Sequence, residues 1–330
     1  MKKIWNIVKE YSIFVILILL AVIFASQSKA FLRVSNILTI LRQSCIMAVV
    51  GMGVMGVIIT GGLNLAVGSC VAMSSVLIAL LSVKGGLVWP LVVLITVVIN
   101  TGIGYLIGLV LNKTKVIPMI GTTAMSTIFS GIAYLLCGGL PISGIPDNIK
   151  WFYQGSVGPI LAPIIMAAAV VLIMGIVLKY TYIGRQLYAT GSNREAARLS
   201  GINTDKIFIM SYTICGALCG LGGLLMAGRV GSGNPTSAAT LSGDVMAALV
   251  IGGVSLRGGE GKVTKAVGGL VLMATLTNGM TLCGVDDYVQ MVVTGSVFLL
   301  AVVLDSIQHN NLLDKMGLRK STPQKAEASK

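Results

Sequence analysis

The side chains that most often carry catalytic chemistry are scarce in this sequence and do not cluster. The only histidine is His309, so the partners for a Ser–His or Cys–His pair are missing from most of the chain. The six cysteines lie inside apolar runs without the Cys-x-x-Cys spacing of zinc sites. There is also no Gly-x-x-x-x-Gly-Lys-[Ser/Thr] phosphate loop. We therefore expect no catalytic residue, no metal site and no cofactor in this chain.

The carboxylates that could couple transport to an ion gradient are also missing from midspan positions. Asp244, Asp286 and Asp287 begin apolar segments and are expected at the membrane interfaces. Ion-coupled carriers usually place Asp, Glu or His inside their spans. The sequence therefore shows no energy source of its own.

Two glycine-rich breaks interrupt the apolar runs. Residues 60–69 read Thr-Gly-Gly-Leu-Asn-Leu-Ala-Val-Gly-Ser, and residues 251–261 read Ile-Gly-Gly-Val-Ser-Leu-Arg-Gly-Gly-Glu-Gly. Broken helices at corresponding places in two halves often mark a transport path, because irregular backbone at membrane depth needs protein or a water-filled cavity around it. Most of the other glycines are expected to let helices pack closely.

The longest hydrophilic segment, residues 180–206, contains a helix signal. Asn193 can cap this helix, Glu195 lies in its first turn, and Gly201 ends it. One face of the helix carries Glu195, Arg198, Leu199 and Ile202. The helix is either a docking surface for a soluble partner or a loop helix that lies on the lipid surface, and the residues alone leave both open.

The composition requires a membrane to position these segments. Hydrophobic residues make up 55% of the 330 residues and charged residues only 11%, less than half of the usual share of about 25%. A soluble enzyme, a nucleic-acid-binding domain and a disordered chain are excluded, because too little polar surface is left. The fold prediction is an all-α polytopic membrane protein with about ten transmembrane segments. These are expected near 11–27, 40–60, 66–83, 88–111, 118–137, 159–179, 206–228, 241–255, 263–283 and 287–304.

The basic residues predict the orientation. The net charge is +13, and a cytoplasmic N-terminus places most of the 24 Lys and Arg on the cytoplasmic side, as the positive-inside rule requires. Both termini are then cytoplasmic. Lys29, Arg33 and Arg42 fall on the opposite side, which indicates either an interfacial helix or an error in the number of spans there. Residues 1–308 are expected to form one transmembrane domain, with 180–206 as a cytoplasmic loop and 309–330 as a polar cytoplasmic tail.

Several segments resemble the permease subunits of ribose- and galactose-type ATP-binding-cassette (ABC) sugar importers. Residues 61–69 look like the family's Gly-Gly-Ile-Asp-Leu-Ser-Val-Gly-Ser, with Asn64 in place of the family's Asp. Residues 190–202 resemble its Gly-x-Asn-x-x-Ala-Ala-x-x-Ser-Gly-Ile loop, and residues 244–261 resemble a third family segment, before which Ser242-Gly243 replaces the common Glu-Leu. The resemblance runs from about residue 36 to residue 305.

The resemblance implies a bacterial inner-membrane permease that works with several partners. These are a cytosolic ATPase that holds ATP and Mg²⁺, an extracytoplasmic sugar-binding protein, and a second permease as homodimer or heterodimer; membrane lipid surrounds the chain and nucleic acid plays no part. The outer loops 138–158 and 229–241 would meet the binding protein, and the Trp151-Phe152-Tyr153 cluster is either such a contact or an interfacial anchor. The coupling helix for the ATPase would comprise Asn193, Arg194, Glu195, Ala196, Ala197, Arg198, Leu199, Ser200 and Gly201.

The predicted function is translocation of a monosaccharide by alternating access, driven by the separate ATPase. The chain itself is then not an enzyme. The candidate residues for the path or its gate are Thr60, Gly61, Gly62, Asn64, Ser69, Asn100 and Asn278. Each polar member of this set could instead make an ordinary interhelical hydrogen bond. The alternative function is an ATP-independent facilitator or carrier for a small polar solute.

Overall fold

The computed structural model describes residues 2–310, and side chains from residue 13 to residue 303. Helices account for most of the described chain, and the four strands have two residues each. The helices of the first half are α1 (Lys2–Gln27), α2 (Val34–Ile59), α3 (Val67–Ala79) with the π-helical turn η1 (Leu80–Lys84), α4 (Trp89–Thr114), α5 (Pro118–Cys137) and α6 (Asp147–Gln154). Those of the second half are α7 (Ala162–Tyr180), α8 (Tyr182–Ser192), α9 (Arg194–Leu199), α10 (Thr204–Val230), α11 (Leu241–Ile251), α12 (Val263–Leu282) and α13 (Asp287–Asn310). The strands are β1 (Ile142–Ser143), β2 (Ser156–Val157), β3 (Ile160–Leu161) and β4 (Ser232–Gly233).

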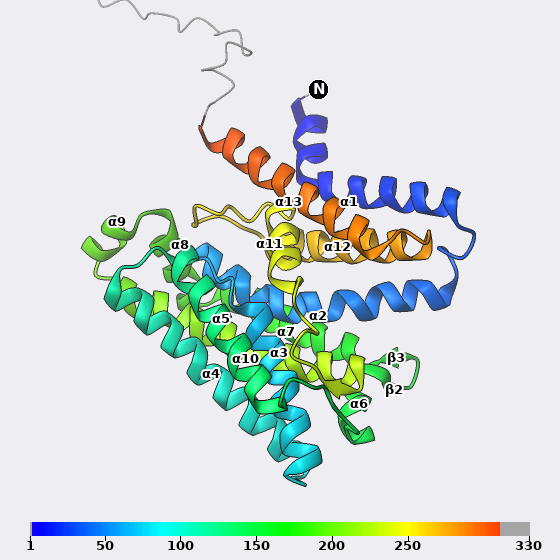
Figure 1. Ribbon diagram of the computed structural model, residues 1–330. Coiled ribbons are helices and arrows are strands. Elements are labelled where there is room, and N and C mark those ends of the chain that lie inside the picture. The colour runs from blue at the N-terminus through cyan, green and yellow to red at the C-terminus, as the bar shows by residue number, and fades with distance from the viewer. Residues whose placement is uncertain (1, 311–330) are drawn as a thin grey trace, which may run out of the picture.

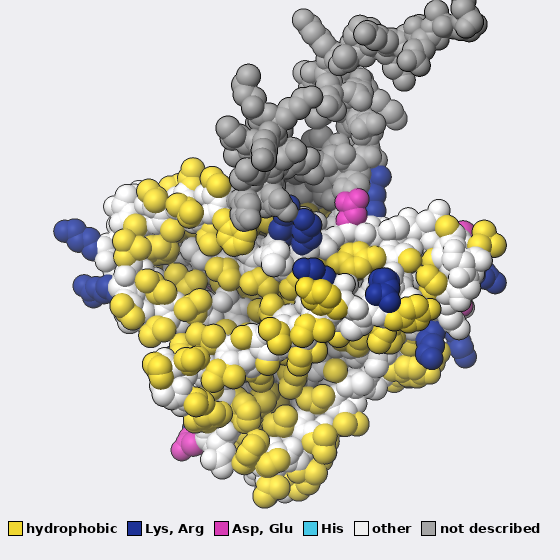
Figure 2. Space-filling model, turned by 180° about the vertical axis from the view of Figure 1, so that it is seen from behind, with side chains coloured by type: hydrophobic (Ala, Val, Ile, Leu, Met, Phe, Trp, Pro, Cys, Tyr) yellow, Lys and Arg dark blue, Asp and Glu magenta, His cyan; other side chains and the backbone are white. Residues whose placement is uncertain are grey.

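All ten predicted segments are helical, as the apolar runs indicate. Within the described residues, six helices are long and apolar enough to cross a membrane, namely α2, α3 with η1, α4, α5, α7 and α10. Shorter apolar helices cover Ile13–Gln27, Leu241–Ile251 and Asp287–Val303. Figure 2 shows hydrophobic side chains over most of one face, with Lys and Arg at its two sides and across its upper part. The number of ten spans and the cytoplasmic termini stay predictions.

Helix α10 is the centre of the packing. It contacts α4, α2 and α3, and side chains from these helices form one continuous hydrophobic core. Its glycines allow this close approach: a Cβ atom at Gly216 would overlap the carbonyl oxygen of Asn100, and Gly104 lies directly opposite on α4. In lipid the hydrophobic effect does little to bring helices together, and close packing between small residues takes its place. The packing role predicted for most of the glycines holds at this crossing.

The two ends of the molecule differ in structure (Figure 1). Helices α8 and α9 lie at one end, here called the α9 end, and α6 with the short strands lies at the opposite end, here called the α6 end. Strand β1 pairs antiparallel with β4, and β2 with β3. The β1–β4 pairing joins the two loops 138–158 and 229–241, which are far apart in the sequence.

The structure changes the prediction at the first turn between helices. Helix α2 begins at Val34, six residues before the expected segment, and Arg42 lies within it. Among the described residues, no separate interfacial helix stands between α1 and α2; the chain turns over residues 28–33. The first turns of α2 carry the polar residues Ser35, Asn36 and Thr39, so the apolar run does not mark this start. The predicted polar tail, 309–330, lies outside the described residues except for its first two, which end α13.

Candidate functional site

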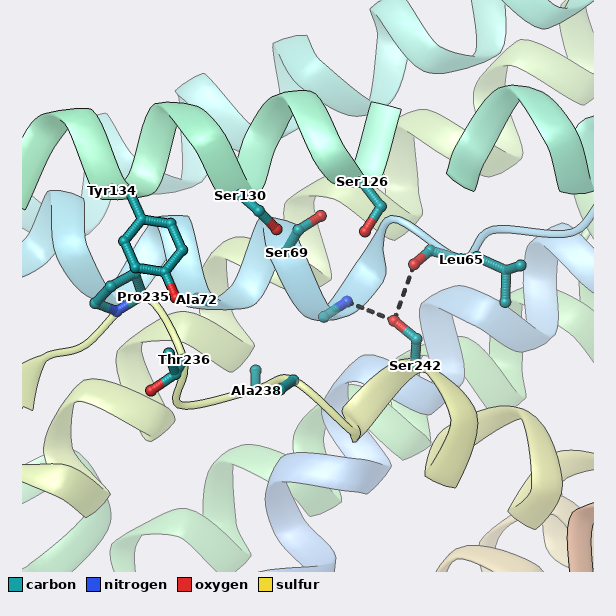
Figure 3. A pocket seen from close by; sticks show the side chains of 12 residues that line it. Leu65, Ser69, Ala72, Ser126, Ser130, Tyr134, Pro235, Thr236, Ala238 and Ser242 are labelled. Atoms are coloured by element: carbon teal, nitrogen blue, oxygen red, sulfur yellow. Dashed lines mark hydrogen bonds between the residues drawn. The ribbon is translucent and has the colours of Figure 1, made fainter. Parts of the chain in front are cut away.

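A pocket of about 240 Å³ lies between α3, α5 and the segment that leads into α11. Its lining is rich in hydroxyl groups and holds no charged side chain. Figure 3 shows Ser69, Ser126 and Ser130 on facing sides of α3 and α5, with Tyr134 further along. Thr236, Ala238 and Ser242 close the pocket from the α11 side. An uncharged cavity with many hydroxyl groups suits a neutral solute that donates and accepts several hydrogen bonds.

One serine joins the walls of this pocket. The Ser242 hydroxyl donates to the carbonyl oxygen of Leu65 at 3.0 Å and accepts from the N–H of Gly68 at 2.8 Å (Figure 3). Position 68 has no room for a side chain, because a Cβ atom there would lie 2.6 Å from the carbonyl oxygen of Ala238. The start of α3 and the start of α11 are therefore held together by backbone contact and one hydroxyl.

We predict that Ser242→Ala lowers the stability of the purified protein. The change leaves a carbonyl and an N–H without the hydroxyl between them, which costs about 1–3 kcal/mol. The expected result is a lower melting temperature in detergent. Ser237→Ala is the matched control, since the Ser237 hydroxyl bonds only within its own turn, to Asn234 at 2.8 Å. Equal melting temperatures for the two variants would contradict this role of Ser242.

The first glycine-rich break is held by side chains from two other helices. The Tyr212 hydroxyl donates to the carbonyl oxygen of Leu63 at 3.0 Å, and the Thr122 hydroxyl accepts from the N–H of Leu65 at 3.1 Å. Tyr212 comes from α10 and Thr122 from α5. The backbone at Leu63 and Leu65 is thus tied to two helices through its polar groups, as irregular backbone at membrane depth requires.

The structure does not bring the predicted path residues into one site. Only Ser69 lines the pocket. Asn64 is 3% exposed; its Oδ1 accepts from the N–H of Ala66 at 3.1 Å and its Nδ2 lies 3.5 Å from the Cys215 sulfur, so it shapes the turn before α3. Thr60 is buried, and its hydroxyl lies 3.2 Å from that of Ser211.

The remaining predicted path residues lie apart from the pocket. Asn100 is fully buried at the contact of α4 with α10, where its Nδ2 donates to the carbonyl oxygen of Thr96 at 2.9 Å. Asn278 is buried on α12. Gly62 is buried beside Tyr212, whereas Gly61 is exposed at the α9 end.

Three distant segments meet at the α9 end. The N–H of Gly259 donates to the carbonyl oxygen of Ile59 at 2.8 Å. A Cβ atom at Gly191 would overlap that same oxygen, and one at Gly258 would lie 2.8 Å from the nitrogen of Gly61. The end of α2, the end of α8 and the second glycine-rich break therefore touch through backbone. These contacts connect the end of α8 to the break that leads to α3.

Helix α9 has the local structure that its sequence predicts. The Asn193 side chain accepts from the N–H of Ala196 at 3.0 Å and caps the helix, and Gly201 adopts φ +82 directly after it. Ala197 is buried and holds the helix to the body of the protein. The outward side chains are Glu195, Ala196, Arg198, Leu199 and Ser200, and the Leu199 side chain is 88% exposed.

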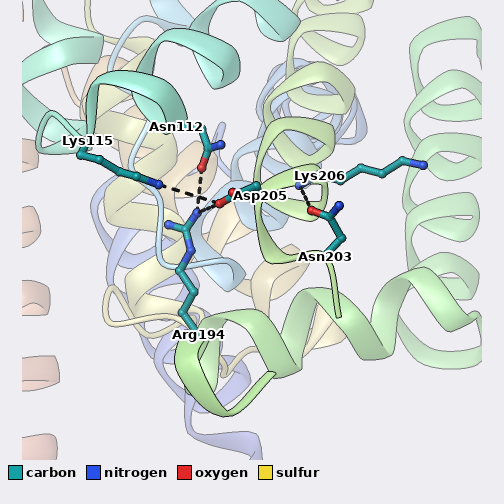
Figure 4. A network of polar contacts seen from close by, with 6 residues as sticks. All are labelled: Asn112, Lys115, Arg194, Asn203, Asp205 and Lys206. Carbon is teal, nitrogen blue, oxygen red and sulfur yellow. Dashed lines mark hydrogen bonds and ion pairs between the residues drawn. The ribbon is translucent and has the colours of Figure 1, made fainter. Parts of the chain in front are cut away.

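Arg194 fixes α9 to the ends of two long helices (Figure 4). Its Nη2 donates to Asn112 Oδ1 of α4 at 2.8 Å and to Asp205 Oδ1 of α10 at 2.7 Å. Its guanidinium also lies 5.3 Å from the centre of the Phe208 ring. Lys115 adds an ion pair with Asp205 at 3.9 Å. The planar, permanently charged guanidinium can make these contacts together, which an ammonium group cannot do as well.

We predict that Arg194→Ala loosens α9 without unfolding the protein. The loss of hydrogen bonds to a charged group is expected to raise amide hydrogen exchange over residues 193–201 by about tenfold. Arg198→Ala on the same helix is the control, because the Arg198 side chain is exposed. Unchanged exchange in Arg194→Ala would show that α9 is held by Ala197 and the cap alone.

The α6 end presents paired loops and an aromatic cluster. The Trp89 ring from α4 lies 5.5 Å from the Phe152 ring, which in turn lies 5.8 Å from Trp151. Tyr153 is buried, whereas Trp151 remains 44% exposed. Lys150 pairs with Asp147 at 2.9 Å, and this pairing lowers the pKa of Asp147. Within residues 151–153, Tyr153 therefore packs inside the protein, whereas Trp151 is available at the surface.

Sequence reasoning missed most of the pocket. Ser126, Ser130 and Tyr134 follow Thr122 at intervals of four, so one face of a single helix carries a stripe of hydroxyl groups. This spacing could have indicated a polar lining within an otherwise apolar segment. Thr236 and Ser242 carry no comparable signal, because only the packing brings their segment to α5.

Comparison with known proteins agrees with this architecture. The family model described as "Branched-chain amino acid transport system / permease component" matches residues 36–302. The ribose import permease protein RbsC of Bacillus subtilis (strain 168) is 36% identical over 303 residues, which cover 91% of this chain and 94% of the relative. RbsC of Escherichia coli (strain K12) is 34% identical over 309 residues, covering 92% of this chain and 95% of the relative.

A second kind of relative matches almost as well. The galactose/methyl galactoside import permease protein MglC of Escherichia coli (strain K12) is 33% identical over 326 residues, covering 93% of this chain and 97% of the relative. No solved structure gives a significant match. The matched range includes both glycine-rich breaks, the hydroxyl-lined pocket and α9. The chain therefore belongs to the membrane permease family described as the permease component of the branched-chain amino acid transport system.

Proposed function

We propose that this chain is the permease subunit of an ABC importer that moves a monosaccharide across the bacterial inner membrane. The main evidence for a sugar as substrate is the hydroxyl-lined pocket, which lacks any charged lining residue. An amino acid would bring two charges into this cavity, and buried charges need ionic or strongly dipolar partners. A sugar needs only hydroxyl groups. The names of the relatives, which are ribose and galactose permeases, favour the same substrate class.

The ATPase would dock on α9 from the cytoplasm. Five outward residues on a short, well-capped helix include one large apolar side chain, Leu199. Exposed apolar side chains of this kind anchor protein contacts. The chain offers no phosphate loop of its own, so ATP and Mg²⁺ belong to the partner. The α9 end is then cytoplasmic, which agrees with the positive-inside orientation and cytoplasmic termini.

The conformational change would travel along the backbone contacts at the α9 end. ATP-driven closure of the ATPase pair displaces α9, and Arg194 passes the movement to α4 and α10. The contact of Gly191 with Ile59 carries it to the end of α2 and the following break. That break leads directly to Leu65 and Ser69, which line the pocket. The pocket thereby opens alternately to the two sides of the membrane as two permeases rock against each other.

A sugar-binding protein would dock at the α6 end. There the loops 138–158 and 229–241 are joined by the β1–β4 pairing, so they form one surface. That surface lies at the opposite end from α9 (Figure 1). This arrangement is required if the binding protein delivers the sugar from outside and the ATPase acts from the cytoplasm.

Uptake of radiolabelled monosaccharides in cells with and without the gene tests the proposed function. The expected result is uptake that stops when ATP is depleted and continues when the ion gradients are collapsed by ionophores. Uptake that depends on an ion gradient would favour a carrier, and uptake indifferent to both would favour a facilitator. Uptake of branched-chain amino acids, with no sugar uptake, would contradict the substrate class.

A further inference from the structure

A second cavity, unrelated to the hydroxyl-lined pocket, lies at the α9 end between α7, α8 and the start of α12. Its volume is about 650 Å³, within the range of small-molecule sites. The apolar part of the lining includes Leu172, Ile176 and Val263. The polar part includes Lys179 and Lys262. We call this cavity the α7–α12 groove.

The groove is apolar toward the membrane interior and basic toward the α9 end. Leu172 and Lys179 are seven residues apart on α7, which corresponds to about 10 Å along a helix. Helix α7 is one of the six helices that can span a membrane, and Lys179 is in its last turn. With α7 across the membrane, the apolar half would lie at the depth of the acyl chains and the lysine end at the depth of the headgroups, on the side that the proposed function makes cytoplasmic.

The walls of the groove are fixed and leave space between the helices. The Tyr188 hydroxyl donates to the carbonyl oxygen of Gly261 at 2.7 Å, so α8 is tied to the segment that precedes α12. On α7, a Cβ atom at Gly175 would meet only Val263, at 4.0 Å. The Lys179 ammonium lies 5.0 Å from the centre of the Tyr180 ring, an aromatic position typical of the membrane interface.

The electrostatics favour an anionic occupant. The two charged residues that line the groove, Lys179 and Lys262, are both lysines, and no carboxylate lines it. Leu172 and Ile176 are exposed to the surroundings of the helix, and a soluble partner cannot reach them at that depth. Basic pockets between transmembrane helices at the cytoplasmic side suit anionic lipid headgroups.

We propose that the α7–α12 groove binds one anionic phospholipid, with its phosphate held by Lys179 and Lys262 and an acyl chain along Leu172 and Ile176. This site is separate from the sugar path. It would fasten the lipid to the same helices, α7 and α8, that support α9.

Native mass spectrometry of the purified full chain in mild detergent tests this site. The protein is titrated in parallel with phosphatidylglycerol and phosphatidylcholine, and the ratio of the retained lipids is measured. Two lysines near a headgroup predict that Lys179→Gln/Lys262→Gln lowers the preference for phosphatidylglycerol by about 30-fold. The pair Lys113→Gln/Lys206→Gln removes the same charge from the α9 end outside the groove and is expected to keep the preference.

A second variant tests the groove rather than the charge. Gly175→Leu places a side chain in the space beside Val263, so the retention of the tightly bound lipid should fall for both headgroups while the protein stays folded. The proposal is overturned if the lysine pair can be removed without losing the preference, or if the control pair loses it equally. It is also overturned if the bound lipid disappears when the chain is purified with its associated subunits, because the groove would then be a subunit contact.

Discussion

Leu199→Asp is expected to reduce sugar uptake by at least tenfold while the permease stays folded in the membrane. The Leu199 side chain is 88% exposed on a helix whose other side is held by Ala197 and Arg194, so the change removes no internal contact. An apolar anchor at the centre of a protein contact typically contributes 2 kcal/mol or more, which corresponds to about 30-fold in affinity. A carboxylate at this position would also be desolvated in the contact.

Two variants make this prediction specific. Leu199→Ala should cause a smaller loss, because it shortens the anchor without adding a charge. Lys206→Asp introduces a carboxylate on an exposed residue outside α9, at the start of α10, where the helix dipole tolerates it, and should leave uptake near normal. Protein levels and melting temperature are measured alongside. Normal uptake in Leu199→Asp would mean that α9 is not the docking element.

Ser130→Leu is expected to block translocation of the sugar from within the pocket. The leucine side chain fills a substantial part of the roughly 240 Å³ cavity and replaces a hydroxyl with methyl groups. Because the added atoms enter open space, folding should be preserved. The expected loss of uptake is more than tenfold, whereas binding of the ATPase should be unchanged. The measurement is initial-rate uptake combined with co-purification of the ATPase.

The matched control for the pocket is Thr127→Leu. Thr127 lies on the same helix, is exposed, and does not line the cavity. It undergoes a similar change in size and polarity. If both variants transport equally well, the hydroxyl-lined pocket is not on the path. If both variants lose transport, substitutions anywhere on α5 impair transport, and the loss in Ser130→Leu cannot be assigned to the pocket.

The helical segments could be predicted from the sequence because apolar run length alone nearly defines them. All ten segments are helices, and the cap and end of α9 follow from Asn193 and Gly201. What failed was local: the start of α2 at Val34 was hidden by the polar residues Ser35, Asn36 and Thr39. The β1–β4 pairing also escaped prediction, because two-residue strands leave no pattern in the sequence.

The candidate site was predicted less well than the fold. The glycine-rich break at residues 60–69 does lead into the pocket, but Ser69 alone of the predicted path residues lines it. Asn64 instead bonds within the turn before α3, and the Nδ2 of Asn100 bonds within α4. A polar side chain in an apolar run can serve a path or a helix contact, and the sequence does not distinguish them. The local partners of these residues, Ala66 and Thr96, are fixed by the turn and the helix in which they lie, whereas the contact of Asn64 with Cys215 of α10 depends on the packing of distant segments.

The measurement that tests the account most directly is photo-crosslinking from position 199 in the native membrane. A photoreactive amino acid replaces Leu199, and the captured proteins are identified by mass spectrometry, with position 206 as the control. We expect capture of an ATP-binding-cassette ATPase from position 199 and much less from position 206. Capture of lipid alone at position 199, under conditions in which the importer transports sugar, would contradict it.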